Sequence, residues 1–228
     1  MDVDAVRFLF HEEAGAPHVT LKGEAFKYIV KVRRHRVGDT VALRHPDHSE
    51  TLYTYRLESS DGRRAELQRL GEEQRRIGAV RPLHIGWCVI DPKSVEKVLP
   101  QLNEMGVARI TYIACDRSQR QFNPDFDRFR RILEASMQQC GRSEWMALET
   151  AASLEAFLEA NPQTVVLDFT EETLSETEGI DTVLIGCEGG FSDEERERLS
   201  QCRTVRFDTP LILRSESAAV ASAAKILL

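Results

Sequence analysis

The most informative stretch of this 228-residue chain is VLIGCEGGFSDEE, residues 183–195. It begins with an apolar run typical of a buried strand, and the run ends at Gly186. Ser192 and Glu195 match the S-x-x-E capping box that opens a helix. Glycines at such a turn let a ligand approach the backbone, and the first N–H groups of the helix are free to bind it. A tight turn without a ligand has the same pattern, so both interpretations stay open at this point.

On both sides of this stretch, from residue 82 to the end, strand and helix patterns alternate. The nearly continuous apolar run LHIGWCVI, residues 83–90, is expected of a strand buried on both faces of a parallel sheet. Further strands are predicted at 110–114, 165–169, 183–186 and 205–207, and helices at 94–105, 125–139, 153–160, 193–200 and 215–228. Repeated strand–helix units of this size predict an α/β domain with a mostly parallel sheet.

The first seventy residues have a different pattern, mostly short β segments without alternating helices. Short β segments are predicted at 7–10, 19–21, 40–44, 51–57 and 65–70, with one amphipathic helix at 24–32. A small β-barrel carrying one helix is the simplest arrangement of these segments. We therefore expect a barrel over residues 1–73, a linker over 74–81 and the α/β domain over 82–228.

The composition excludes several classes of protein. With 42% hydrophobic and 29% charged residues the chain is typical of globular domains, and no apolar run approaches the roughly eighteen residues of a membrane span. The start, MDVDAVRFLF, carries aspartates where a secretory signal has positive charge, so we expect a cytoplasmic protein. The five cysteines form no C-x-x-C pair, which argues against zinc and against a disulfide framework; we expect no metal.

The net charge of −7 is unevenly distributed. Residues 1–80 hold 14 Lys and Arg against 13 Asp and Glu, a net charge of +1, so the net charge of the remainder is −8. Residues 21–36 alone hold six basic residues and one acid. Because salt screens distant charges, such a patch can bind a polyanion in an acidic protein, and RNA is the partner we expect. A solvated helix end is the alternative.

Two further segments carry candidate functional residues. In DTPLILRSESAAVAS, residues 208–222, Arg214 and Glu216 come between a strand and a helix of small residues, at the strand end where open α/β sheets bind ligands. A buried helix with a surface Arg–Glu pair is the alternative. In EASMQQCGR, residues 134–142, a helix ends at Gly141 with Arg142 just beyond, which by itself predicts only a helix cap.

Several familiar site motifs are missing from the sequence. It contains no G-x-x-x-x-G-K-[ST], no G-x-G-x-x-G after a strand, no G-x-S-x-G and no H-E-x-x-H. A nucleotide-dependent oxidoreductase on a doubly wound sheet is therefore disfavoured.

Taken together, I-G-C-E-G-G-F-S at 185–192 and L-R-S-E-S-A at 213–218 resemble the two signature loops of the bacterial 16S ribosomal RNA uracil-N3 methyltransferases, which belong to the SPOUT class. Q-C-G-R at 139–142 and E-M-G-V at 104–107 are similar to two further motifs of that family. The resemblance extends to R-F at 7–8 and V-R-R at 32–34, and it covers essentially the whole chain.

The resemblance implies a PUA-like barrel followed by an α/β domain with a C-terminal trefoil knot, assembled as a homodimer. It implies S-adenosylmethionine as cofactor and methylation of N3 of a uridine in 16S ribosomal RNA of the small subunit. Arg214 would hold the base or its developing negative charge, and Glu216 would orient Arg214 or contact the base. The implied cofactor-binding residues are Leu167, Ile185, Gly186, Glu188, Gly189, Gly190, Leu211 and Leu213. The implied RNA-binding residues are Arg7, Lys31, Arg33, Arg34, Arg36 and Arg142.

The chain departs from the family pattern at several positions. Cys187 replaces a proline, Thr209 a glycine, Leu211 an arginine and Gln138 an acid, and Pro100-Gln101 stands where many members have Gln-Lys. The cofactor loops survive these changes. A non-catalytic RNA-binding assembly factor and methylation of a different RNA position are the alternatives that stay open.

Overall fold

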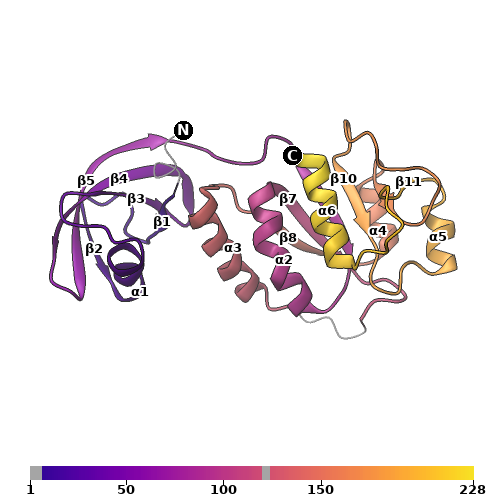
Figure 1. The fold of residues 1–228 in the computed structure, drawn as a ribbon, viewed down its shortest axis with the longest axis horizontal. Coiled ribbons are helices and arrows are strands. Elements are labelled where there is room, and N and C mark those ends of the chain that lie inside the picture. The colour runs from indigo at the N-terminus through magenta and orange to yellow at the C-terminus, as the bar shows by residue number, and fades with distance from the viewer. Residues whose placement is uncertain (1–6, 120–123) are drawn as a thin grey trace. The chain divides into compact units, whose positions relative to one another are not determined.

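The computed structural model describes residues 7–119 and 124–228, and the chain divides into two compact units (Figure 1). The first unit comprises Met1–Gly78 and Glu134–Glu144, and the second comprises Ala79–Leu133 and Trp145–Leu228. Residues 134–144 thus cluster with the N-terminal part despite their distance in the sequence. The domain boundaries at 73 and 82 stay a prediction.

The first unit is built on a five-stranded sheet with strand order β1-β3-β4-β5-β2. β1 pairs with β3 in parallel, and the other neighbours are antiparallel. The strands are β1 (Leu9–Phe10), β2 (His18–Lys22), β3 (Thr40–His45), β4 (His48–Ser60) and β5 (Arg64–Gln74). β4 and β5 form a hairpin longer than the sequence predicts, because exposed polar residues extend both strands without an apolar signal. The unit's core lies between this sheet and Phe26 and Ile29 of the adjoining helix.

The helix predicted at 24–32 is present, but its second part is not an α-helix. α1 (Gly23–Phe26) continues into the π-helix η2 (Lys27–Val32), in which the backbone N–H of Arg33 donates to the carbonyl of Tyr28. The chain then turns sharply, because Arg34 has a φ of 61°. π-turns frequently occur at functional sites. Here the π-turn ends the helix immediately before the basic run Arg33-Arg34-His35-Arg36.

The second unit is an α/β domain with a six-stranded, fully parallel sheet in the order β11-β9-β10-β6-β7-β8. This confirms the α/β fold class. The strands are β6 (Leu83–Cys88), β7 (Val107–Ile113), β8 (Ala147–Ala151), β9 (Val165–Leu167), β10 (Thr182–Ile185) and β11 (Arg203–Val205). The helices are α2 (Pro92–Met105), α3 (Phe126–Cys140), α4 (Leu154–Ala160), α5 (Asp193–Leu199) and α6 (Ser215–Leu227). The sequence patterns miss β8, since ALETA is a half-exposed edge strand without an apolar run.

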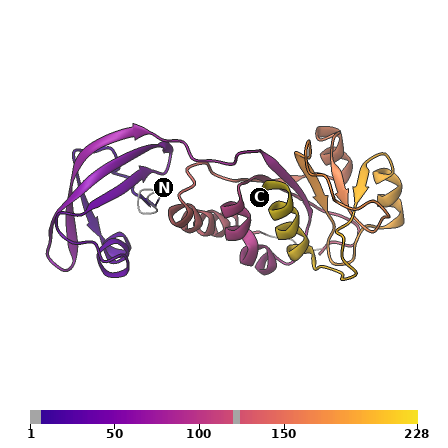
Figure 2. The same cartoon turned by 45° about the horizontal axis from the view of Figure 1, so that its top comes forward.

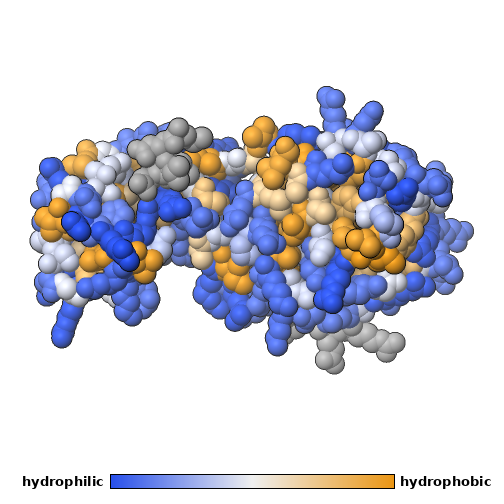
Figure 3. Space-filling model, in the orientation of Figure 1, coloured by the Kyte–Doolittle hydropathy of each residue, from blue (hydrophilic) through white to orange (hydrophobic). Residues whose placement is uncertain are grey.

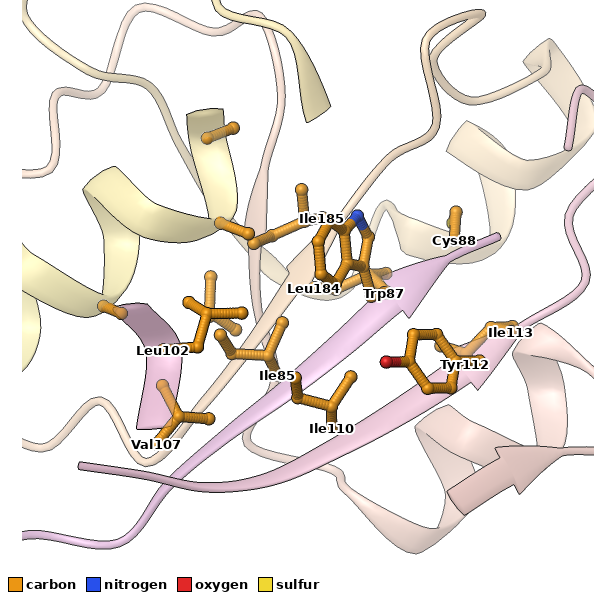
Figure 4. Close-up of a cluster of buried hydrophobic side chains, with 14 of the residues drawn as sticks. Ile85, Trp87, Cys88, Leu102, Val107, Ile110, Tyr112, Ile113, Leu184 and Ile185 are labelled. Atoms are coloured by element: carbon orange, nitrogen blue, oxygen red, sulfur yellow. The ribbon is translucent and has the colours of Figure 1, made fainter. Parts of the chain in front are cut away.

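The core of the second unit is centred on β6 and its neighbours (Figure 4). Trp87, Ile85 and Tyr112 are almost completely buried, and the Trp87 indole points toward α6. α6 packs against α2, β6 and β10, and it lies beside α2 in both views (Figures 1 and 2). Its buried residues are mostly Ala and Ser, so it can approach the strands closely. Within the described ranges, no helix has the length and hydropathy needed to cross a membrane.

Candidate active site

A cavity of about 320 Å³ opens at the carboxyl edge of the second unit's parallel sheet. Its wall is formed by the ends of β9 and β10, the glycine loop that follows β10, and the segment that leads into α6. This is the edge at which open α/β sheets bind ligands. The sequence-predicted ligand loops at 185–192 and 208–218 therefore meet around one cavity.

The wall of the cavity is largely apolar. Leu167, Ile185 and Phe207 contribute to the wall, together with Leu211 and Ile212. Leu211 and Ile212 are 72% and 79% exposed, so they present apolar surface to solvent at this wall. An apolar wall with a few polar groups is the typical lining of a site for a small organic ligand.

The glycine loop has the conformation that the sequence predicts. Ser192 Oγ accepts a hydrogen bond from the Glu195 backbone N–H at 3.2 Å, and Glu195 Oε2 accepts one from the Ser192 backbone N–H at 2.8 Å. Gly190 has a φ of +65°, which favours glycine. A Cβ atom on Gly186 would lie 3.3 Å from the Phe191 ring, so the loop folds back tightly over the end of β10. The predicted capping box is confirmed.

The segment after β7 supports this loop from outside the cavity, a feature the sequence does not reveal. The Asp116 backbone N–H donates to Glu195 Oε1 at 2.8 Å, and Arg117 Nη1 donates to the Gly189 carbonyl oxygen at 3.0 Å. A Cβ atom on Gly189 would lie 3.0 Å from Arg117 Cβ. Gly189 is therefore required for close packing, and it does not line the cavity.

A buried hydrogen-bond chain joins the two ligand loops. Trp87 Nε1 donates to Ser215 Oγ at 2.8 Å, and Ser215 Oγ donates to the Gly186 carbonyl oxygen at 2.6 Å. Trp87 is completely buried and Ser215 is 5% exposed. The chain fixes the first residue of α6 against the start of the glycine loop, and with it the position of Arg214.

Replacing Ser215 with alanine should destabilise the protein by about 1–3 kcal/mol. The buried Trp87 N–H and the Gly186 carbonyl would both lose their partner, and an unsatisfied buried polar group costs about this much. Urea-induced unfolding followed by tryptophan fluorescence measures the change. Ser217→Ala is the matched control, because Ser217 is exposed in the same helical turn and should change stability little. Equal stabilities of the two variants would contradict the proposed role of Ser215.

Arg214 lies at the N-cap of α6 and lines the cavity. Among the described residues, no carboxylate forms an ion pair with its exposed guanidinium, so the cation is available to an anionic ligand. Glu216 is half-buried in the first turn of α6 and is not part of the cavity wall. The expected pairing of Glu216 with Arg214 is thus not present in the described part of the chain, and its contact with a base stays a prediction.

Seven of the eight residues expected to bind the cofactor line this cavity; Gly189 is the exception. The departures from the family pattern are accommodated locally. Cys187 Sγ donates to the Gly190 carbonyl oxygen at 3.6 Å, and burial raises the pKa of its thiol, so the side chain is neutral. Thr209 Oγ1 accepts from the Leu211 backbone N–H at 3.2 Å. The sequence prediction did not include Asp168, Arg206 and Phe207, which also line the cavity.

Comparison with known proteins shows which family has this fold and cavity. Residues 79–227 match the family model described as an RNA methyltransferase domain. The chain belongs to this RNA methyltransferase family. It is 36% identical over 219 residues to the Helicobacter pylori protein "Ribosomal RNA small subunit methyltransferase E", a match that spans 94% of this chain and 96% of the relative.

Solved structures show the same fold over nearly the full length of the methyltransferase. A ribosomal RNA small subunit methyltransferase E from Neisseria gonorrhoeae, bound to S-adenosylmethionine, superposes with a TM-score of 0.74 at 18% identity, covering 96% of this chain and 95% of that one. A Legionella pneumophila protein that holds the cofactor S-adenosylmethionine superposes with a TM-score of 0.76 at 22% identity, with the same coverage.

The first unit of the methyltransferase carries a second, polar cavity of about 970 Å³. Arg7, Arg33 and Arg34 line it together with Tyr28 and Gln139. Three of the residues expected to bind RNA therefore converge on one concave surface, and Gln139 adds an amide from the distant segment 134–144. A cavity with three guanidinium groups suits a polyanion.

The other expected RNA-binding residues of the methyltransferase lie elsewhere. Lys31 and Arg36 are exposed and are close in the sequence to residues that line this cavity, but they do not line it themselves. Lys31 Nζ lies 5.8 Å from the centre of the Phe26 ring. Arg142 is only 5% exposed, and burial lowers its pKa. The next residue, Ser143, binds Ile77 through its side chain and accepts from Ser49 Oγ through its carbonyl oxygen at 2.7 Å. RNA contact by Lys31, Arg36 and Arg142 stays a prediction.

Proposed function

We propose that this methyltransferase transfers a methyl group from S-adenosylmethionine to N3 of a uridine in 16S ribosomal RNA of the small ribosomal subunit. The observation that carries the proposal is the convergence of the glycine loop and Arg214, which has no ion-pair partner among the described residues, on one largely apolar cavity. The full-length similarity to a small-subunit ribosomal RNA methyltransferase supports the choice of substrate.

The cavity fits the cofactor by its chemistry. S-adenosylmethionine supplies, when bound, an electrophilic methyl group on a sulfonium sulfur. The apolar residues Leu167, Ile185, Leu211 and Leu213 would enclose its adenosine part, and Gly186 and Gly190 would let its polar part approach the backbone. Glu188, at the exposed tip of the loop, would shape this approach.

The chain's own contribution to the chemistry concerns the uridine base. N3 of uridine carries a proton at neutral pH and becomes a nucleophile only when that proton leaves. Negative charge then spreads over N3 and the two neighbouring carbonyl oxygens of the base. Arg214, which lines the cavity, would stabilise this anion as it forms, and the bound cofactor would supply the methyl group that N3 accepts.

RNA binding would be the task of the first unit. Arg7, Arg33 and Arg34 would contact phosphates in the polar cavity, and the exposed Lys31 and Arg36 would extend the contact surface. Such contacts position the RNA backbone without reading its sequence. Arg142 is buried, so it would reach RNA only if the surrounding segment moved. Residues 1–80, which contain most of this unit, carry a net charge of +1, and residues 81–228 carry a net charge of −8.

The double change Arg33→Ala/Arg34→Ala should weaken binding of small-subunit ribosomal RNA roughly tenfold at moderate salt. It should also reduce by about two the slope of the logarithm of the binding constant against the logarithm of the salt concentration. Filter binding at several salt concentrations measures both quantities. Arg56→Ala/Arg63→Ala is the matched control, because both arginines are exposed on the β4–β5 hairpin of the same unit, outside the cavity. An equal loss in the control pair would mean that charge alone, and not the cavity, determines binding.

The finer features of the architecture also belong to the proposal. The first unit would be a PUA-like barrel, and the segment from β11 to α6 would pass through the preceding loops as a trefoil knot. The protein would act as a cytoplasmic homodimer. The exposed apolar residues Phe169, Leu211 and Ile212 support a partner subunit beside the cavity, and hydrophobic surface is visible on the second unit in Figure 3.

Incubation with radiolabelled S-adenosylmethionine and small ribosomal subunits that lack the modification tests the proposal. Label should enter 16S ribosomal RNA and should be absent from reactions that contain only large subunits. A protein that binds small subunits but transfers no label, and that releases no heat with S-adenosylmethionine in calorimetry, would be a non-catalytic assembly factor.

A further inference from the structure

Asp168 is a carboxylate in the cavity wall that the mechanism above does not use. It follows β9 directly, and its backbone N–H donates to the Val205 carbonyl oxygen at 3.1 Å, which fixes its place at the carboxyl edge of the sheet. Its side chain is 12% exposed. A carboxylate this well buried at a largely apolar wall carries a desolvation cost and needs partners.

Arg196 of α5 is the partner that the structure provides. Its Nε donates to Asp168 Oδ2 at 2.9 Å, and its Nη2 lies 3.5 Å from Oδ1. The pKa of Arg196 is raised, mainly by this hydrogen bond to Asp168. Arg196 also borders the glycine loop, since a Cβ atom on Gly190 would lie 3.7 Å from Nη2. The pair therefore joins β9, α5 and the glycine loop at one point of the wall.

The geometry leaves Asp168 with unused acceptor capacity. An ionised carboxylate has about four lone-pair sites, and the Arg196 guanidinium takes up those on one side. Among the described residues no group other than Arg196 donates to the Asp168 carboxylate, and Asp168 lines the cavity, so its remaining acceptor sites can accept hydrogen bonds from a ligand there. Such a site binds groups that donate hydrogen bonds, either vicinal hydroxyls or an ammonium group, and disfavours ligands without them.

We infer that Asp168 is a specificity-determining residue that accepts hydrogen bonds from donor groups of the bound cofactor, and that Arg196 is its positioning residue. The inference rests on the proposed function, because the ligand is taken to be S-adenosylmethionine. That molecule carries donors of both kinds, the two ribose hydroxyls and the ammonium group of its methionine part. In either case the Asp168 carboxylate would accept the hydrogen bond.

Calorimetric titration of the full chain tests the inference with two ligands, S-adenosylmethionine and 5′-methylthioadenosine, which keeps the ribose hydroxyls but lacks the ammonium group. Asp168→Asn should weaken binding of S-adenosylmethionine about tenfold or more, as expected for loss of a hydrogen bond to a charged group. An equal loss for methylthioadenosine identifies the ribose as the donor, and an unchanged affinity for it identifies the ammonium group.

Arg196→Gln should weaken binding of S-adenosylmethionine by a smaller factor than Asp168→Asn, because residue 196 acts on the ligand only through Asp168. Arg196→Lys should restore part of the affinity lost in Arg196→Gln. This pair of variants leaves the cavity wall itself intact and serves if Asp168→Asn fails to fold. Asp193→Asn is the matched control: Asp193 lies 3.9 Å from Arg196 Nη1, but its side chain is 98% exposed and outside the cavity.

Wild-type affinity for both ligands in Asp168→Asn would overturn the inference while leaving the proposed function intact. A loss in Arg196→Gln that Asp168→Asn does not share would overturn it as well. Failure of the wild-type protein itself to bind S-adenosylmethionine would overturn both the inference and the proposed function.

Discussion

Arg214→Ala should lower the rate of methyl transfer about a hundredfold or more while leaving the affinity for S-adenosylmethionine nearly unchanged. The guanidinium lies at the cavity wall without an ion-pair partner among the described residues, so its charge is available to the uridine anion. Removing one preorganised group that stabilises a developing anion typically costs a factor of 10²–10³ in kcat. Single-turnover transfer to small subunits, together with calorimetric titration of the cofactor, separates the two quantities.

Two further variants make this result specific to Arg214. Arg214→Lys keeps the charge but not the planar fork, and it should recover only part of the rate. Arg203→Ala removes an arginine of the same unit that is paired with Glu172 at 2.7 Å and lies outside the cavity; it should transfer at the wild-type rate. Normal turnover by Arg214→Ala would remove Arg214 from the catalytic role.

Gly190→Val should weaken binding of S-adenosylmethionine by about tenfold to thirtyfold. The φ of +65° at Gly190 costs an L-residue roughly 1–2 kcal/mol, and a β-branched residue is especially unsuited to it. The loop would leave the conformation that forms this wall of the cavity, although a Cβ atom at this position would itself meet Arg196 Nη2 at an ordinary contact distance of 3.7 Å. Calorimetric titration measures the affinity.

Gly179→Val is the matched control for this change. Gly179 has a φ of +77° in the same unit, with no atom within 4 Å of a Cβ placed there, and it does not line the cavity. It should lose a similar amount of folding free energy and keep the wild-type affinity for the cofactor. If both variants lost affinity equally, global destabilisation would explain the result and the loop would have no special role.

The sequence predicts those features that depend on local patterns. The apolar run and capping box at 183–195 correctly predict a strand, a glycine turn and a helix, because each element depends on residues next to one another. The alternating elements after residue 82 predict the parallel sheet, since repeated strand–helix units leave few other arrangements. The meeting of the two ligand loops could be predicted because parallel strands end at a common edge.

The features that the sequence patterns miss depend on contacts between distant residues. The edge strand β8 has no apolar run, and its pairing with β7 is needed to recognise it. The π-turn after Phe26 has no propensity signal that distinguishes it from an α-helix. The hydrogen bonds of Asp116 and Arg117 to the glycine loop, and the pairing of Arg196 with Asp168, join segments separated by 28 to 79 residues. A single sequence carries no periodic pattern for such contacts.

Mass-spectrometric analysis of nucleosides from 16S ribosomal RNA, after reaction of small subunits with this protein and S-adenosylmethionine, identifies the methylated atom. We expect one product, uridine methylated at N3, in an amount approaching one per small subunit, and we expect no such product with Arg214→Ala. A methyl group on C5, on a ribose hydroxyl or on another base would contradict the assignment of the cavity to uridine N3 chemistry.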